Sequence, residues 1–340
     1  MQAPMQKGLS WLESIGFAKS KVTPIRGDVS PRRYFRVETG PNDSRILAAY
    51  PETESGAFER FLITTRLLIA ARVRVPIIHA VDPGKGFMLL EDLGTRSVFD
   101  LTKGPWADLR CYLEAATAIL DRLAAQQAAE FEAINPPLDA DRLGRELLDA
   151  RGVFLDHPAF SGDASERAAL HGALDELLSG LAADRLVPSH RDFMSRNLML
   201  AESTSVVAVI DHQDACLAPR EYDLASLLND SLFPSLAQER ELLGVLGGDP
   251  RRLVSYRRCA VQRALKATAT FVKFALRGSN RHLPLIAPTL ARAAFQLEQL
   301  PEGRSLPERL FVRWRDRART QNGIASVLRA AGGQADTGRC

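Results

Sequence analysis

Cysteines are few in this sequence and stand far apart. The chain has four of them, Cys111, Cys216, Cys259 and Cys340, and no C-x-x-C pair. Zinc sites and the disulfide frameworks of small secreted domains both need closely or regularly spaced cysteines. The pattern therefore indicates neither kind of site, and we expect the cysteines to be reduced thiols.

Long apolar segments are missing as well. A helix that crosses a bilayer needs roughly 18 or more uninterrupted apolar residues, and no stretch of the sequence approaches that length. Residues 1–17 lack the continuous apolar core of a secretory signal peptide. We therefore expect a cytoplasmic protein without a membrane partner.

Charge of one sign hardly exceeds charge of the other. Lys and Arg number 44 and Asp and Glu number 41, so the formal net charge is only +3. This balance gives no reason to expect a nucleic-acid partner, and no feature indicates a protein partner. With 340 residues, 46% of them hydrophobic, the chain is long enough for one large domain or two lobes.

The first ninety residues alternate strand-like runs with turns. Four short, mostly apolar runs have the pattern of strands, at 33–37, 45–50, 77–81 and 87–91. The turn residues Gly40-Pro41-Asn42-Asp43 separate the first two runs. Between the two pairs, apolar residues recur at helical spacing from Phe58 to Ile69, which predicts an amphipathic helix packed on the strands.

Helical periodicity dominates the rest of the chain. It extends through residues 94–331, interrupted by a strand-like run at 206–210. The tail at 332–340 is polar and glycine-rich, and we expect it to be disordered. The predicted fold class is α+β, with a small β-rich lobe at 1–93 followed by a larger helical lobe.

The most specific motif is the segment His190-Arg191-Asp192-Phe193-Met194-Ser195-Arg196-Asn197. It has the H-R-D-x-x-x-x-N order of a kinase catalytic loop. Phosphoryl transfer needs a carboxylate that accepts the proton of the attacking hydroxyl, and an amide oxygen that ligates a metal ion on the phosphates. The order predicts Asp192 as the catalytic base and Asn197 as a metal ligand.

A second carboxylate, Asp211, follows the strand-like run at 206–210. Carboxylate oxygens at such a position suit a Mg²⁺ ion held between phosphate oxygens, so we predict that Asp211 is the other metal ligand. Taken singly, an H-R-D triplet is also compatible with surface charge, and an Asp after a strand with a turn. Their order, after a β-rich lobe, favours phosphoryl transfer.

Around these motifs the chain resembles the aminoglycoside phosphotransferase superfamily. The resemblance is carried by HRDFMSRNLML at 190–200 and by IDHQDACLAPREYDLASLLND at 210–230. Three further segments, SPRRYFRV at 30–37, GFMLLEDLG at 86–94 and RALKATATFVKFALRGSNRHLP at 263–284, are similar to the superfamily's cell-wall amino-sugar kinases. Those kinases phosphorylate the anomeric hydroxyl of N-acetylmuramate and N-acetylglucosamine in cell-wall recycling.

The resemblance implies a protein-kinase-like bilobal fold. Residues 1–93 would form the nucleotide-binding lobe with its hinge, and residues 94–331 the catalytic and acceptor lobe. ATP and Mg²⁺ are the implied cofactors, and an amino sugar is the implied acceptor. Asp223 matches a carboxylate that braces the catalytic loop.

Three residues depart from the pattern of the amino-sugar kinases. That group usually has Tyr-His where this chain has Phe193-Met194, and Phe where it has His212. The first departure lies beside the predicted base, so it bears on how the acceptor is held.

Nucleotide binding is predicted at the hinge. The resemblance implies that backbone groups around Glu91, Asp92 and Leu93 bond the adenine edge, because the main chain supplies both a donor and an acceptor. The segment is also compatible with an ordinary buried strand and turn.

The phosphate-binding lysine that kinases carry on their third strand is missing, since Ala48 and Ala49 stand where we expect it. We predict that Ser30 and Arg32 supply this contact instead. Strand alternation places Arg32 on the same side as Tyr34 and places Arg33 on the other.

Four charged residues are candidates for acceptor recognition, namely Arg196, Asp214, Arg263 and Lys266. Arg263 and Lys266 also fit the solvated face of a helix. Two other functions stay open at this point. One is a kinase of the same superfamily that acts on an aminoglycoside, a choline-like compound or another small alcohol, and the other is a nucleotide-binding module with weak catalysis.

Overall fold

A computed structural model of the chain describes residues 2–18, 20–25, 31–41, 43–201, 206–229 and 232–319. The chain forms two compact units. The first comprises residues 1–123 and 196–215, and the second comprises residues 124–195 and 216–340.

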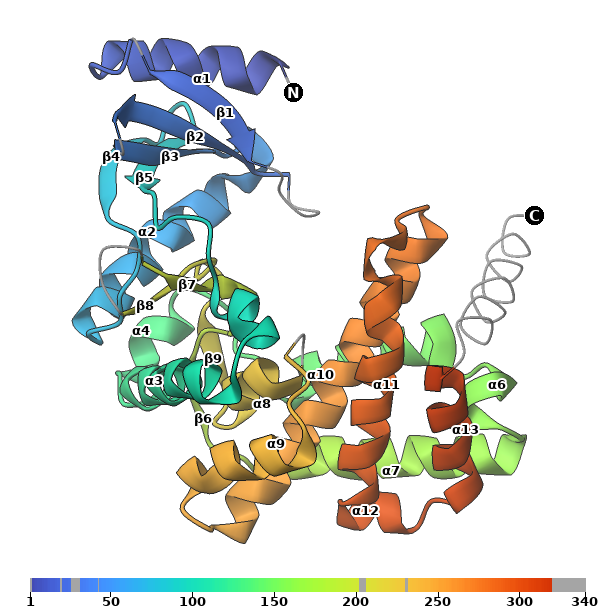
Figure 1. Cartoon of the computed structure of the whole chain (residues 1–340). Coiled ribbons are helices and arrows are strands. Elements are labelled where there is room, and N and C mark those ends of the chain that lie inside the picture. Colours follow the sequence, from blue (N-terminus) through green and yellow to red (C-terminus); the bar gives the residue numbers. More distant parts are fainter. Residues whose placement is uncertain are drawn as a thin grey trace. The chain divides into compact units, whose positions relative to one another are not determined.

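The first unit is built on an antiparallel sheet of five strands in the order β1-β2-β3-β5-β4 (Figure 1). Its strands are β1 (Lys21–Ile25), β2 (Arg33–Gly40), β3 (Asp43–Ala49), β4 (Ile78–Asp82) and β5 (Phe87–Glu91). Gly86, in the β4–β5 turn, has a φ of +71°, and a Cβ there would lie 2.4 Å from the carbonyl oxygen of Tyr50. The turn therefore needs glycine.

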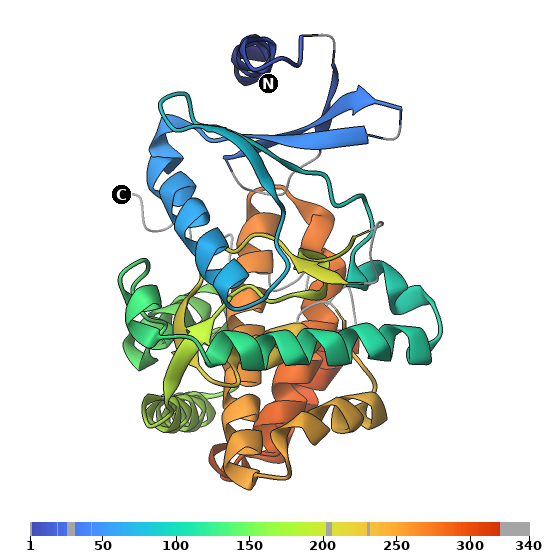
Figure 2. The ribbon, with the colours of Figure 1, turned by 90° about the vertical axis from the view of Figure 1, so that its left-hand side faces the viewer.

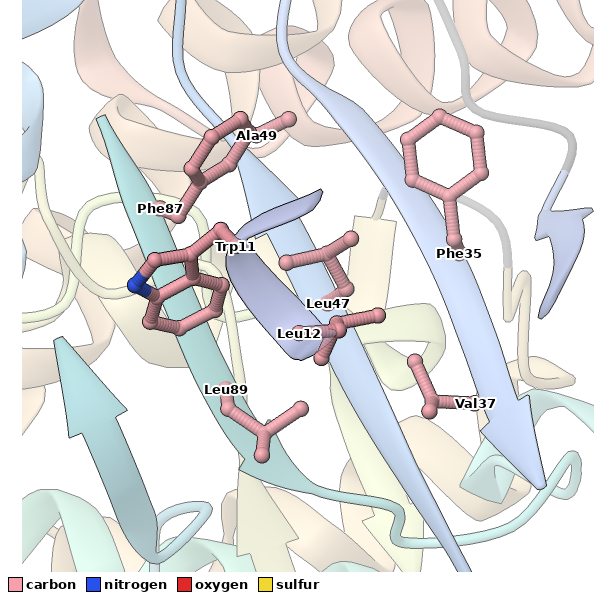
Figure 3. Packing of buried hydrophobic residues seen from close by; sticks show 8 residues of the cluster. All are labelled: Trp11, Leu12, Phe35, Val37, Leu47, Ala49, Phe87 and Leu89. Carbon is pink, nitrogen blue, oxygen red and sulfur yellow. The ribbon is translucent and has the colours of Figure 1, made fainter. Parts of the chain in front are cut away.

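Helix α1 (Gln2–Ser14) covers one face of this sheet. Figure 3 shows Trp11 and Leu12 over the inward side chains of β2, β3 and β5. The Trp11 ring stacks on Phe87 with 5.5 Å between ring centroids. Strand alternation sends Phe35 and Val37 to this face, and together these residues form a closed apolar core.

Helix α2 (Ser55–Ala70) packs on the other face (Figure 2). Phe58 and Phe61 of this helix join Ala48 and Met88 of the sheet in a second apolar cluster. Tyr34 is half-buried against the same cluster. The sheet is thus covered on both faces, and its two sets of side chains have different neighbours.

The first unit further contains a short helix, a long helix and a hairpin. They are η2 (Val98–Lys103), α3 (Trp106–Ala124), and the antiparallel pair β7 (Leu198–Leu200) and β8 (Val207–Val209). The Val209 N–H donates to the carbonyl of Arg74, just after α2. This bond ties the hairpin to the rest of the unit.

The second unit is mainly helical. Its helices include α4 (Ala128–Glu132), α5 (Ala140–Ala150), η3 (Arg151–Leu155), α6 (Pro158–Ser161), α7 (Ala164–Ala182), α8 (Tyr222–Asn229), α9 (Leu236–Leu242), η5 (Leu243–Leu246), α10 (Pro250–Leu276), η6 (Asn280–His282), α11 (Leu283–Glu298), α12 (Pro301–Arg304) and α13 (Glu308–Arg319). Strands β6 (Leu186–Ser189) and β9 (Cys216–Pro219) pair antiparallel within it. Helix α10 begins where Asp249 caps the N–H of Arg251 at 2.9 Å and Pro250 occupies the first turn.

A buried polar network fixes three of these helices to one another. The Glu239 carboxylate of α9 accepts hydrogen bonds from Tyr256 of α10 at 2.5 Å and from Gln296 of α11 at 2.6 Å. It also pairs with Arg292 at 2.7 Å. Because a buried charge is tolerated only when paired and hydrogen-bonded, this network specifies how α9, α10 and α11 pack.

The structure confirms the four strands predicted before residue 93 and the helix between them. It adds β1 and α1, which have weaker patterns. The compact units differ from the predicted lobes, because the first unit extends past residue 93 to residue 123 and takes in residues 196–215. The tail at 332–340 lies outside the described residues. Within the part of the chain that the structure describes, no helix is long and apolar enough to cross a membrane.

We predict that Trp11→Ala lowers the free energy of unfolding by about 3–5 kcal/mol, because it empties a packed aromatic site. Glu13→Ala, on the exposed side of the same helix, should change it by less than about 0.5 kcal/mol. Urea denaturation of both variants checks this. Equal losses in the two would show that α1 contributes little through Trp11.

Candidate active site

The predicted catalytic loop follows β6 in the second unit, and its backbone is tied down by Asp223. The carboxylate of Asp223 accepts the N–H of His190 at 2.5 Å and that of Arg191 at 2.9 Å. Arg191 has a φ of +76°, a region that non-glycine residues rarely adopt. Such a backbone persists only where its surroundings hold it, and Asp223 makes the bonds that do so.

Asp192 lies in a positively charged environment within this unit. Its own burial would raise the pKa of its carboxyl, but Arg263 and Lys266 outweigh that effect and hold the pKa below its usual value. The side chain is only half-buried. Asp192 is therefore an ionised carboxylate, the form a proton acceptor needs.

Arg263 and Lys266 come to this place from α10. Arg263 donates to the carbonyl of Arg191 at 2.9 Å and lies over the ring of Tyr222. Lys266 pairs with Glu146 of α5 at 3.0 Å. These contacts differ from a solvated helix face, and Arg263 supports the catalytic loop directly.

Asn197 and Asp211 lie at the same end of the β7–β8 hairpin in the first unit. Leu198 pairs with Val209 in the hairpin, and the Ile210 N–H donates to the carbonyl of Asn197 at 3.0 Å. The two predicted metal ligands thus flank one end of a short ribbon. The structure brings together residues that are fourteen positions apart in sequence.

Asp211 is held in an unusual conformation. Its φ is +63°, and its carboxylate accepts a hydrogen bond from Gln213 at 3.0 Å. Arg32 lies 3.4 Å from the same carboxylate. The Asp211 side chain keeps 41% of its surface exposed, so its oxygens are accessible.

Arg32 and Arg33 diverge as strand alternation predicts. The guanidinium of Arg32 lies beside Asp211 and 5.8 Å from the centroid of the Tyr50 ring, and its side chain is only 12% exposed. Arg33 instead lines a cavity with residues of α1. Ser30 lies outside the described residues.

Ion pairs and hydrogen bonds hold the side chains of Glu91 and Asp92 in the hinge segment. The Asp92 carboxylate accepts two hydrogen bonds from Arg36, at 2.5 and 3.1 Å, and one from Ser44 at 2.7 Å. Glu91 pairs with Arg74, and its own N–H donates to the carbonyl of Ile77. The Glu91 N–H is therefore committed within the protein, and the expected adenine contact of the Glu91 main chain stays a prediction.

Leu93 differs from Glu91 in this respect. Among the described residues, no main-chain hydrogen bond involves Leu93. Its side chain is buried in an apolar cluster with Ala201 and Ala208, against which Met199 and Ile210 pack. The hinge and the hairpin thus share an apolar surface beside available main-chain groups.

The other two candidates for acceptor contact lie in the first unit. The Arg196 guanidinium sits 3.6 Å from the centroid of the Phe99 ring on η2. Asp214 is half-buried, accepts a hydrogen bond from Gln213 and lies 3.9 Å from Arg60. Arg196 and Asp214 thus have different partners, whereas Arg263 and Lys266 lie together beside Asp192.

Two features of the site went unpredicted. The Arg36–Asp92 pair joins residues 56 positions apart, and only the parity of β2 hinted at the side on which Arg36 lies. His212 is fully buried against α2, a placement that its position in the motif does not predict. Phe193, another of the three residues that depart from the pattern, is fully buried and meets His190 edge-on, so its side chain packs the loop.

Comparison with known proteins assigns the chain to a family. The model of the family described as "Phosphotransferase enzyme family" matches residues 21–258. The chain belongs to this family. The phosphotransferase is also 32% identical over 270 residues to the N-acetylmuramate/N-acetylglucosamine kinase of Pseudomonas putida, a match that covers 78% of this chain and 74% of that protein.

Solved structures show the same fold at low sequence identity. The choline/ethanolamine kinase family protein of Mesorhizobium loti has a TM-score of 0.61 at 16% identity, covering 92% of this chain and 98% of that one. The GDP complex of aminoglycoside 2'-phosphotransferase-IIIa has the same score and identity, with 87% and 98% covered. The predicted α+β, protein-kinase-like fold is confirmed, and the chain is an ATP-dependent small-molecule phosphotransferase.

We predict that Arg263→Met raises the pKa of Asp192 and moves the acid limb of the pH profile of kcat/KM to higher pH. The depressed pKa keeps the carboxylate ionised at low pH, so removing the cation lets protonation occur at a higher pH. Arg263→Lys keeps the charge and should leave the limb close to its original position. Coincident limbs in the two variants would argue against an electrostatic role.

Proposed function

We propose that this phosphotransferase transfers the γ-phosphoryl group of ATP to the anomeric hydroxyl of N-acetylmuramate or N-acetylglucosamine. The observation that carries the proposal is the similarity, over 78% of the chain, to a kinase named for these two sugars. The residues of the candidate site support it chemically.

Asp192 is the proposed base. Its ionised carboxylate would orient the anomeric hydroxyl and accept its proton as the oxygen attacks phosphorus. The bonds from Asp223 to the loop backbone and from Arg263 to the Arg191 carbonyl keep Asp192 in place. Because positioning contributes much of the rate in phosphoryl transfer, these supports belong to the mechanism.

Asn197 and Asp211 fit a Mg²⁺ ion. They bring an amide and a carboxylate to one end of the hairpin, and hard oxygen ligands are those that Mg²⁺ prefers. The exposed part of the Asp211 side chain leaves its oxygens open to such a ligand. When bound, the ion would neutralise developing charge on the phosphates.

Arg32 is the proposed replacement for the missing strand lysine. It lies beside Asp211 on the Tyr34 side of the sheet, and a guanidinium pairs with phosphate oxygens through two parallel hydrogen bonds. Ser30 is proposed to assist it. Main-chain groups of Glu91 and Leu93 are proposed to bond the adenine edge, over the apolar surface of Met199 and Ile210.

The charge around Asp192 is of both signs. Arg263 and Lys266 both act on this carboxylate, and Glu146 pairs with Lys266. N-Acetylglucosamine is neutral, and N-acetylmuramate carries a carboxylate that a cation would attract. The similarity to the amino-sugar kinase, rather than net charge, therefore supports the amino sugars over an aminoglycoside or a choline-like acceptor. Arg196 and Asp214 remain proposed contacts to sugar hydroxyls.

We predict that Asp192→Asn folds and binds ATP but loses turnover by roughly 10²–10⁴-fold, since it removes the proton acceptor and keeps the shape. Steady-state phosphate transfer and calorimetric nucleotide titration check the two parts. Asp211→Asn, in contrast, should weaken Mg²⁺-dependent nucleotide binding because it removes a negative ligand. Near-normal turnover of Asp192→Asn would exclude Asp192 as the base.

We also predict that labelled phosphate from ATP reaches N-acetylglucosamine and N-acetylmuramate but not the same sugars with a methyl group on the C1 oxygen. The methyl glycosides keep every other hydroxyl, so they isolate the anomeric position. An aminoglycoside and choline serve as comparison acceptors. Equal labelling of the free and the methylated sugars would overturn the anomeric assignment.

A further inference from the structure

His212, the residue directly after Asp211, is buried against α2. None of its surface is exposed. Its ring stacks on Phe61 with 4.4 Å between centroids and 29° between planes. Its Nε2 lies 2.7 Å from the Oγ1 of Thr65. Both partners belong to α2 and stand one helical turn apart.

The direction of the His212–Thr65 hydrogen bond follows from the other bond of the threonine. Thr65 donates its hydroxyl hydrogen to the carbonyl of Phe61 at 2.7 Å. A hydroxyl has a single hydrogen to donate, so Thr65 Oγ1 accepts from His212. The ring therefore carries its proton on Nε2, and α2 holds it by both a directional bond and a stacked face.

The backbone next to this ring is the part of the hairpin that needs support. Asp211 has a φ of +63°, which costs free energy for a residue with a Cβ. The ladder between β7 and β8 ends at Leu198 and Val209. Beyond it, the Ala215 N–H donates to the His212 carbonyl, and the His212 side chain reaches α2.

We propose that His212 is a positioning residue that fixes the strained backbone of Asp211, and so the direction of its carboxylate, by bonding Thr65 and stacking on Phe61. The proposal rests on the proposed role of Asp211 as a metal ligand. A phenylalanine at position 212 would supply only the stacking. The histidine adds a hydrogen bond that sets the ring's rotation, and the adjoining backbone with it.

The test compares two threonines of α2. Thr65→Val removes the acceptor of His212. Thr64→Val is the matched control, because Thr64 is equally buried and bonds only to carbonyls of its own helix, those of Arg60 and Phe61. Mg²⁺-dependent ADP binding is measured by calorimetry, half-saturating Mg²⁺ and kcat by turnover, and amide exchange of residues 209–215 by mass spectrometry.

Thr65→Val should weaken Mg²⁺-dependent ADP binding by about two- to tenfold, the equivalent of one neutral hydrogen bond. It should also speed amide exchange at residues 209–215, with metal-free nucleotide affinity unchanged. Thr64→Val should do neither, and Thr65→Ser, which keeps the hydroxyl, should restore both. His212→Phe should match Thr65→Val, and the double variant Thr65→Val/His212→Phe should add nothing, because both changes break one bond.

Failure of this proposal is distinguishable from failure of the proposed metal site. If Asp211→Asn weakens Mg²⁺-dependent binding while Thr65→Val behaves like Thr64→Val, the site stands and His212 only packs α2. If Asp211→Asn itself has no effect, the metal assignment falls, and the positioning role falls with it. Additive losses in the double variant would also overturn the proposal.

Discussion

The two hydrogen bonds from the backbone of the catalytic loop to Asp223 are the interaction on which the candidate site depends. They hold His190 and Arg191 in a conformation that the loop would not keep alone, since Arg191 has a positive φ. Asp192 takes its position from that backbone. Burial raises the pKa of Asp223, while His190 and the bonds from the loop N–H groups oppose this effect, so the brace and the loop stabilise one another.

The same arrangement recurs at Asp211, in the other compact unit. Arg191, with its positive φ, precedes the proposed base, and Asp211, also with a positive φ, is itself a proposed metal ligand. The buried side chain of His212 anchors the backbone next to Asp211. Strained conformations cost of order 1–3 kcal/mol each, which the surrounding contacts must offset. Both anchors reach the loop from a helix, with Asp223 near the start of α8 and Thr65 within α2.

Much of this arrangement could be predicted from local pattern. Apolar periodicity was sufficient for β2, β3, β5 and α2, and the spacing of Asp192 and Asn197 was sufficient to predict the roles that we propose for them. Contacts between distant residues could not be predicted in this way. Arg36 meets Asp92 and Glu239 meets Arg292 only because the tertiary fold brings them together, and the commitment of the Glu91 N–H depends on where the α2–β4 connection passes.

The side chains around Ala48 explain why an alanine fits at this position of β3. Ala48 is fully buried in the cluster between the sheet and α2, where a lysine would bring a charge into an apolar core at high free-energy cost. Arg32 reaches Asp211 from the start of β2, along the ring of Tyr50, without entering that core. Because Arg32 lies beside Asp211 without entering this cluster, Ala48 can pack directly against α2. The same helix contacts His212 through Thr65 and Phe61. Ala48 and His212 thus pack against the same helix, both in contact with the cluster around Phe61.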